Sequence, residues 1–286
     1  MKTNFNLIAI VLVINLGFVI PCQSQPYIDL LNIQYINSPD YGIKNEKKNA
    51  IDLKQFSIAS TLPFQFKNKL DALIISPGFD MWSTEINTID KSNNPLYSIS
   101  LPVSFLKTLN NPDWSILSMM IIRKNGYKIS MNDNWQIGGA FLVNFKANEN
   151  LRYKLGVYAN KEFFGLFVVP LLGVDWEISK KTNLFGVLPG NLTLEHRVAK
   201  KIYTGAFFRA ITTSFRLDTG YLRIDENRLG AFIDFYLAKK IVFNVEAGHS
   251  LFRKIRTGVK DKYSTNLNVD DNTYLKIGLA YRLRFQ

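Results

Sequence analysis

Apolar and polar residues alternate along most of the chain. In the stretch 97–105, each odd-numbered residue is apolar and the residues between are serine or proline. The pattern recurs, with few exceptions, in 56–66, 135–145, 151–157 and 275–285. Successive side chains of a strand point to opposite faces, so this alternation predicts β-strands with one apolar face each. Segments with the apolar spacing of a helix are sparse.

The predicted strands are long for a water-soluble protein. Most cover about 9–11 residues, the length of a tilted membrane strand, whereas soluble strands more often have about 5–6. Short and longer connections also take turns along the chain, as in transmembrane barrels with short periplasmic turns and longer outer loops. The short ones are 67–69, 146–150, 179–183, 199–201 and 238–240; the longer ones are 37–49, 83–95, 124–133, 217–227 and 253–273.

The strand count depends on one short pair of segments. Stretches 184–188 and 192–198 are separated by Pro189-Gly190-Asn191. If both cross the membrane, fourteen strands result; if neither does, twelve remain; if they form one strand, the number is odd. Single-chain barrels favour even numbers. We therefore predict an all-β fold, a transmembrane antiparallel up-and-down β-barrel of about twelve strands, with fourteen possible.

Four prolines count against this prediction. Pro63, Pro77, Pro102 and Pro170 fall within strand-like segments. Each removes a ladder hydrogen bond, which is costly where no water can replace it. They are compatible with a barrel only near a rim or at a bulge.

The first 24 residues have the features of a signal peptide. Lys2 precedes an apolar stretch, 7–20, which is shorter than the roughly 20 residues of a membrane-spanning helix. The small residues Cys22 and Ser24 predict cleavage after Ser24, which leaves 25–286 as the barrel domain in the outer membrane. Acylation of Cys22 as a lipoprotein is an alternative, but Pro21 occupies the position where a small residue is expected.

Alternation alone does not separate a membrane barrel from a soluble one. A soluble barrel turns its apolar face inward, whereas an outer-membrane barrel turns it toward lipid and keeps the interior polar. Strand length, the asymmetry of the loops and the secretion signal favour the membrane barrel. A soluble all-β protein stays the alternative.

Composition excludes several classes of function. The net charge of +12 comes from scattered Lys and Arg, which suits a solvated surface better than nucleic-acid binding. One cysteine allows no internal disulfide, and two histidines make a metal site improbable. No glycine-rich phosphate loop or HExxH pattern is present, so we expect no cofactor.

The last strand carries a pattern that other outer-membrane barrels share. Such barrels commonly end in an alternating strand with a terminal aromatic, which the barrel assembly machinery reads. Tyr281, Leu283 and Phe285 fit this assembly signal, although Phe285 is penultimate. The chain also resembles a domain-of-unknown-function family of outer-membrane β-barrel proteins. The resemblance lies in "LFGVLPGNLTLEHRV", "IYTGAFFRA", "RLGAFIDFYLAKKIVFNVEAGHSLFR" and the ending. It implies the fold and the location and brings no activity.

Charged residues on the polar faces are the candidate lining of the interior. They are Asp71, Asp80, Arg152, Lys154, Asp175, Glu177, Glu195, Arg197, Arg209, Asp234, Glu246, Lys276, Arg282 and Arg284. One interpretation is an ion-pair network that fills a structural barrel with a plugged lumen. The other is a conduit or cavity for passive passage or binding of a small polar or anionic solute, which is the function that we predict.

An enzyme acting on lipid is a third possibility. Glu246, His249 and Ser250 could supply a catalytic set, as could Glu195 with His196. Adjacent strand residues point to opposite faces, which separates His249 from Ser250. We therefore do not expect an enzyme.

Tryptophans near strand ends predict an aromatic girdle at the membrane boundary. They are Trp82, Trp114, Trp135 and Trp176.

Overall fold

The computed structural model describes residues 25–43, 46–84, 95–130, 132–259, 265–267 and 269–285. The predicted signal peptide, its cleavage site and Cys22 lie outside these residues. Among the described residues, no helix is long and apolar enough to cross a membrane.

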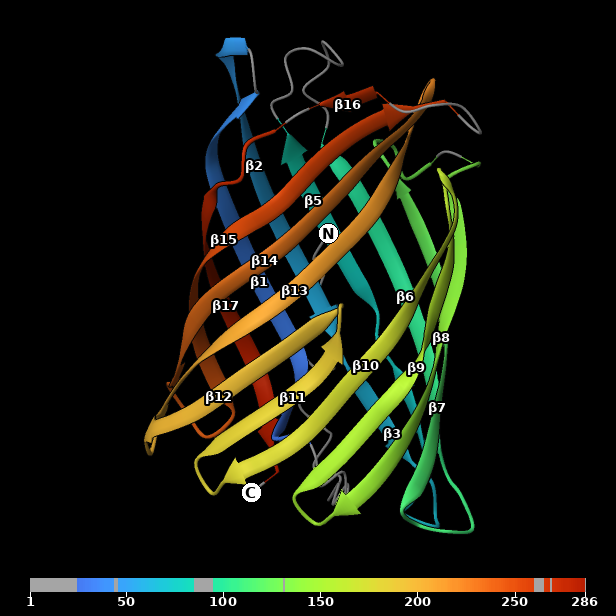
Figure 1. Cartoon of the computed structure of the whole chain (residues 1–286), viewed down its shortest axis with the longest axis vertical. Helices are drawn as coiled ribbons and strands as arrows, with labels where there is room; N and C mark the ends of the chain where they lie inside the picture. The colour runs from blue at the N-terminus through green and yellow to red at the C-terminus, as the bar shows by residue number, and fades with distance from the viewer. Residues whose placement is uncertain are drawn as a thin grey trace, which may run out of the picture.

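Strands make up almost all of the described chain (Figure 1). Their bounds are β1 Tyr27–Ile43, β2 Glu46–Ser60, β3 Leu62–Gln65, β4 Ala72–Ile75, β5 Gly78–Thr84, β6 Leu96–Thr108, β7 Trp114–Gly126, β8 Trp135–Asn148, β9 Leu151–Glu162, β10 Gly165–Ser179, β11 Thr182–Leu188, β12 Asn191–Ala199, β13 Ile202–Leu217, β14 Gly220–Tyr236, β15 Ile241–Gly258, β16 Thr265–Leu267 and β17 Thr273–Arg284.

These elements form a closed antiparallel barrel of fourteen wall strands in the described residues. β2 and β3 follow one another as one wall strand, β4 and β5 do the same, and β16 pairs with the end of β15. β17 pairs with both β15 and β1, which closes the ring. The β11–β12 hairpin belongs to the wall, so the count is fourteen, the alternative that the sequence left open, and not the preferred twelve.

Several wall strands are longer than the sequence predicts. The ladder between β13 and β14 runs without interruption to Leu217 and Gly220, so most of the predicted loop 217–227 is strand. β1 and β2 likewise extend to Ile43 and Glu46 through the predicted loop 37–49. Outside the membrane a hairpin needs no apolar face, and the alternation that marks a membrane strand is therefore absent from these extensions.

The outer surface is apolar, as a wall in contact with lipid requires. Outward-facing residues of β17 such as Leu275, Ile277 and Leu279 are about half exposed. Trp114, Trp135 and Trp176 also face outward, in agreement with the predicted girdle. Trp82 does not: it is 3% exposed and lies inside the barrel. It has the same parity along β5 as Asp80, which faces the interior, and the period of two decides its direction.

The prolines sit where the ladders are irregular or have an edge. Pro77 separates β4 from β5, and its carbonyl accepts a hydrogen bond from Ser60 at 3.0 Å. The carbonyl of Pro102, on the neighbouring β6, accepts one from Ser76 at 2.9 Å. Pro63 lies in the short β3 near the lower end of the wall. Pro170 belongs to the site described next.

Candidate functional site

The wall has a window between β10 and β13. β11 and β12 are much shorter than their neighbours, and their hairpin ends about half-way up the barrel (Figure 1). β11 pairs with β10 only from Leu172 downward, and β12 pairs with β13 only up to Phe208. Within the described residues, 165–171 of β10 and 209–215 of β13 therefore face each other without a shared ladder.

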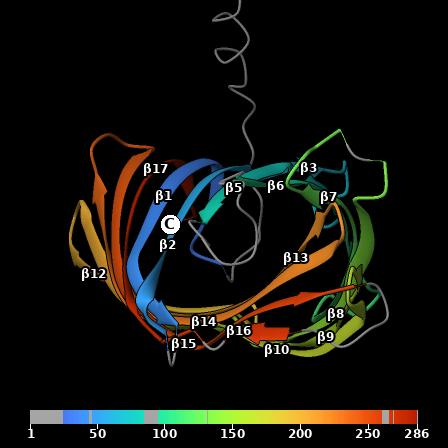
Figure 2. The same ribbon diagram turned by 90° about the horizontal axis from the view of Figure 1, so that it is seen from above.

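The lower edge of the window is the turn Pro189–Gly190. The Pro189 carbonyl accepts a hydrogen bond from the amide of Ala210 on β13 at 2.9 Å. The upper edge is formed where β13 crosses the barrel mouth toward β7 (Figure 2). There the amide of Tyr127 donates to the Arg216 carbonyl at 3.2 Å.

A buried polar cluster fixes this crossing. The Ser214 hydroxyl on β13 donates to Glu162 at 2.5 Å and accepts from Gln136 at 2.9 Å. The side-chain amide of Asn125 donates to the Ser214 carbonyl at 3.0 Å. These four residues come from β7, β8, β9 and β13 and are at most 4% exposed. The cluster holds β13 against the inner face of the neighbouring wall and leaves the window open below it.

Pro170 lies on the edge of the window. The Glu177 amide donates to the Asn150 carbonyl on the β9 side at 2.8 Å, and the β9–β10 register has no shift. Hydrogen-bonding direction alternates along a strand, so the Pro170 nitrogen points away from β9 and into the window. A proline removes no ladder bond there, which explains its presence within β10.

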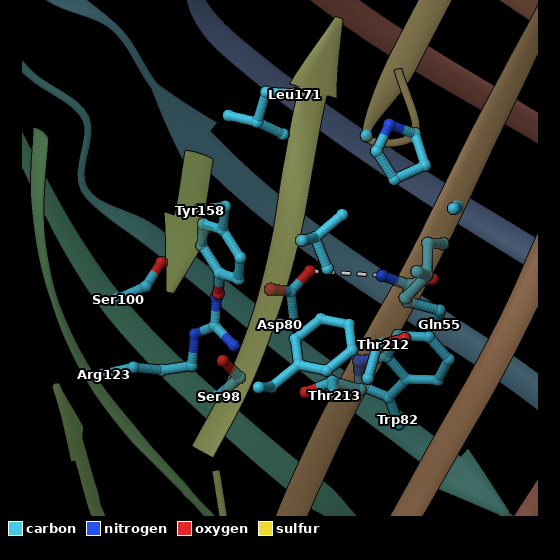
Figure 3. A pocket seen from close by; sticks show the side chains of 16 residues that line it. Gln55, Asp80, Trp82, Ser98, Ser100, Arg123, Tyr158, Leu171, Thr212 and Thr213 are labelled. Atoms are coloured by element: carbon cyan, nitrogen blue, oxygen red, sulfur yellow. Dashed lines mark hydrogen bonds between the residues drawn. The ribbon is translucent and has the colours of Figure 1, made fainter. Parts of the chain in front are cut away.

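Behind the window lies a chamber of about 430 Å³ (Figure 3). This volume is near the lower limit for small-molecule sites, which span about 300–1,000 Å³. Its apolar sides are formed by Phe167, Val169 and Leu171 of β10 with Ile211 of β13. The other positions of the same parity on β10 hold Gly, Asp, Glu and Ser, so the apolar lining is confined to the window.

The side of the chamber that is formed by β5, β6 and β7, its floor, is polar and carries one positive and one negative charge. Arg123 of β7 points toward the hydroxyl of Tyr158, and Asp80 of β5 lies nearby, with serines of β6 around them (Figure 3). Arg123 lies 3.6 Å from a carboxylate oxygen of Glu162, and its side chain is 20% exposed. Asp80 accepts hydrogen bonds from Ser57 at 2.5 Å and from Gln55 at 3.2 Å. The floor thus offers donors and acceptors side by side.

The interior below the chamber is filled by ion pairs. Arg284 pairs with Glu195 at 2.7 Å, and Arg282 with Asp234 at 2.5 Å. The other pairs are Lys154–Asp175 at 2.6 Å, Lys276–Glu246 at 2.5 Å and Arg209–Glu246 at 2.9 Å. The structure brings these predicted residues together in matched charges, as one of the two interpretations of the sequence expected. Whether they also line a path for solutes stays a prediction.

The remaining predicted residues lie near strand ends, in a hairpin or at the chamber. Arg152, Glu177 and Arg197 are half-buried near the lower ends of their strands. Asp71 lies in the β3–β4 hairpin, where a hydrogen bond from Lys107 lowers its pKa from 3.8 to about 2. Asp80 faces the chamber.

The sequence did not identify several interior residues. Glu226 pairs with Arg228 and with Arg253, each at 3.0 Å, and all three side chains are almost fully buried. Glu226 and Arg253 lie within stretches predicted as loops. Arg123 belongs to a strand whose polar residues are few. The only signal for the window was the stretch 165–174, which is apolar on both faces and contains Pro170.

An apolar cluster occupies part of the upper interior, beside the Glu226 ion pairs. Leu53, Trp82, Phe215, Ile224 and Ile255, which come from five different strands, belong to this cluster. With the ion pairs below, this cluster bounds the chamber along the barrel axis. The window is therefore the side on which the chamber approaches the membrane.

The residues considered for catalysis lie on opposite faces. His249 is exposed on the outside of β15, whereas Ser250 is buried and donates a hydrogen bond to Glu226. His196 is exposed and contacts the Thr182 hydroxyl at 2.9 Å. In the part of the chain that the structure describes, no three His, Cys, Asp or Glu residues form a group suited to a metal ion.

Several solved structures are similar to this chain. The COG4313 outer membrane channel from Pseudomonas putida F1 matches 92% of this chain and 98% of its own, at a TM-score of 0.51 and 10% identity. A Pseudomonas aeruginosa FadL homologue matches 92% and 91%, at 0.47 and 9% identity. The NanC porin matches 88% and 100%, at 0.42 and 9% identity. None of the curated proteins matches the chain.

A family model covers nearly the whole sequence. It spans residues 21–282 and is described as a domain of unknown function, DUF6268. The chain therefore belongs to the DUF6268 family, and its fourteen-stranded wall has the fold of an outer-membrane β-barrel channel.

Proposed function

We propose that this barrel binds a small uncharged amphiphile in the chamber behind the window. The observation that carries the proposal is the pairing of apolar sides with a floor that holds Arg123 and Asp80 together. The apolar sides suit a hydrocarbon segment, and a few convergent polar groups are typical of a site that fixes the orientation of a ligand.

The two charges of the floor favour an uncharged polar group. A hydroxyl accepts a hydrogen bond from Arg123 and donates one to Asp80, which satisfies both sides. A carboxylate would lie close to Asp80 and an ammonium close to Arg123, and a like charge in a poorly hydrated site is costly. The proposed ligand is thus a small polar solute that also has an apolar segment.

Axial passage of a polar solute is less well supported. The ion pairs below the chamber are almost fully buried, and an apolar cluster lies above it. These features also support the second candidate, a structural barrel with a plugged lumen. Conductance in planar bilayers separates the two ideas, because a polar conduit gives discrete channel events and a plugged barrel gives none.

Binding is tested on protein transferred to amphipol, which contains no small amphiphile. Calorimetry compares decanoylglycerol, decanoate and decylammonium, which have chains of equal length and different head groups. We expect decanoylglycerol to bind most tightly. Failure of all three to bind contradicts the proposal, as does equal affinity for the three head groups.

Charge removal on the floor tests the orientation. Arg123→Gln should weaken decanoylglycerol binding by about tenfold or more, since a hydrogen bond to a charged group contributes about 1.5–3 kcal/mol. The same change should improve the relative binding of decylammonium, and Asp80→Asn that of decanoate. Lys124→Gln is the matched control, because Lys124 lies on the same strand and stacks on the outward-facing Trp135. Identical effects of Arg123→Gln and Lys124→Gln would overturn the assignment.

A further inference from the structure

We infer that the window is a lateral passage through which a single-chain, uncharged amphiphile moves between the bilayer and the chamber. The inference rests on the proposed function and adds the route and the source of the ligand. It starts from the gap between β10 and β13 in a wall whose described strands otherwise form one closed sheet.

The window opens toward the hydrocarbon part of the membrane. On its β10 side the outward residues Leu166, Val168 and Leu172 are 74%, 52% and 60% exposed. On the adjoining β9, Leu155 and Val157 are also exposed. Exposed aliphatic residues at this density mark a lipid-facing band. A molecule that enters here comes from the bilayer.

Backbone groups at the window edges need polar partners. Within the described residues, 165–171 and 209–213 have a ladder on one side only. Lipid cannot satisfy backbone N–H and C=O groups, so an open edge at membrane depth occurs where it lines a cavity. The polar group of an amphiphile passing the window can bond to these edges on its way to the floor.

The frame of the window is fixed on each side. The Ser214 cluster holds its upper edge, and the hydrogen bond from Ala210 to Pro189 holds its lower edge. The inward face of β10 is apolar only here, through Phe167, Val169 and Leu171. An apolar surface therefore continues from the outer wall through the window to the chamber.

A single chain fits this passage better than a phospholipid. The chamber of about 430 Å³ is at the small end of ligand sites, and its floor offers one polar cluster for one head group. Trp82 lines the chamber, so its fluorescence can report a ligand bound there. The other tryptophans face outward, and replacing Trp114, Trp135 and Trp176 by Phe leaves Trp82 as the reporter.

The experiment follows Trp82 fluorescence in vesicles that contain the single-tryptophan protein. The vesicles are mixed with others that carry a monoacylglycerol brominated in mid-chain, because bromine quenches tryptophan at short range. We expect quenching of Trp82 by the monoacylglycerol and little quenching by a phosphatidylcholine that is brominated at the same depth and built into the protein vesicles themselves. Equal quenching by the phospholipid, or none by the monoacylglycerol, overturns the inference.

A pair of variants tests the route. Ala210→Phe places a ring at the window edge, and Ala206→Phe places the same ring four residues earlier, on an exposed part of β13 where the wall is continuous. We expect quenching to become several times slower in Ala210→Phe and to keep its rate in Ala206→Phe. An unchanged rate in Ala210→Phe, or a lower final quenching reached at an unchanged rate, overturns the lateral route.

The two proposals fail in different ways. If decanoylglycerol does not bind in amphipol, the proposed function is wrong. If it binds there but Ala210→Phe does not slow entry from the bilayer, only the lateral route is wrong. A boiling-dependent shift in gel mobility confirms that each variant has folded.

Discussion

Glu246 is the residue whose replacement best tests how the lower interior is built. Its carboxylate is 1% exposed and binds Lys276 at 2.5 Å, Arg209 at 2.9 Å and the Tyr274 hydroxyl at 2.9 Å. Glu246→Gln keeps the shape and removes the charge. Lys276, which is itself buried, then lies beside Arg209 with no carboxylate between them.

The expected cost depends on whether water reaches these groups. Removing one partner of a buried ion pair costs about 3–5 kcal/mol, because the other charge stays buried. A pair in contact with water contributes about 0–1 kcal/mol. The burial of Glu246 and Lys276 predicts the larger value for the loss in the free energy of unfolding.

The assay is urea unfolding in lipid vesicles, followed by the boiling-dependent gel shift. Glu149→Gln is the control, since Glu149 pairs with Lys146 at 2.5 Å but its side chain is 74% exposed. Glu246→Gln combined with Lys276→Met should recover part of the loss, because the uncompensated charge is gone. Equal small costs for Glu246→Gln and Glu149→Gln would refute the dry network and indicate a water-filled lumen.

Three further changes test the wall and its rim. The Lys107 hydrogen bond lowers the pKa of Asp71 from 3.8 to about 2. The stabilisation from the ionised Asp71 is therefore present above pH 3.8 and lost as pH falls through about 2. The unfolding midpoints of Asp71→Asn and of the parent protein should converge over that window. Leu279→Arg, on the lipid face, should cost about 2–4 kcal/mol in the same urea assay if it lies at mid-membrane, and no cost would contradict the assigned face. Gly186→Ala should destabilise the barrel more than Gly165→Ala: both have positive φ, but only at Gly186 would the new methyl group collide with backbone, so equal costs would refute this.

The charges of the lower interior largely cancel one another. Matched pairs such as Arg284–Glu195 leave little net charge below the chamber, so the basic ending of the chain creates no anion site by itself. The final strand instead closes the barrel, with Leu283 opposite Ile28 of β1. Recognition of Tyr281, Leu283 and Phe285 by the assembly machinery stays a prediction, and so does the cleaved signal peptide.

The alternation of apolar and polar residues is enough to predict the class of fold and the two faces of the wall. A period of two over long segments requires strands with an apolar and a polar side, and closing fourteen of them places one side toward lipid. The inward direction of Lys154, Asp175, Glu195 and Arg282 followed from parity alone. The prediction for Trp82 is wrong because it rests on the position of this residue near a strand end and not on its parity along the strand.

The position of the site depends on contacts between strands that are distant in sequence. The period of two fixes the direction of a side chain but not the height at which a hairpin ends, so it could not reveal that β11 and β12 stop half-way. Nor could it show that β13 crosses the mouth to meet β7, because that contact joins Gly126 and Arg216, which are distant in sequence. The window and the chamber exist through these non-local pairings, and a local pattern of residues carries no record of them.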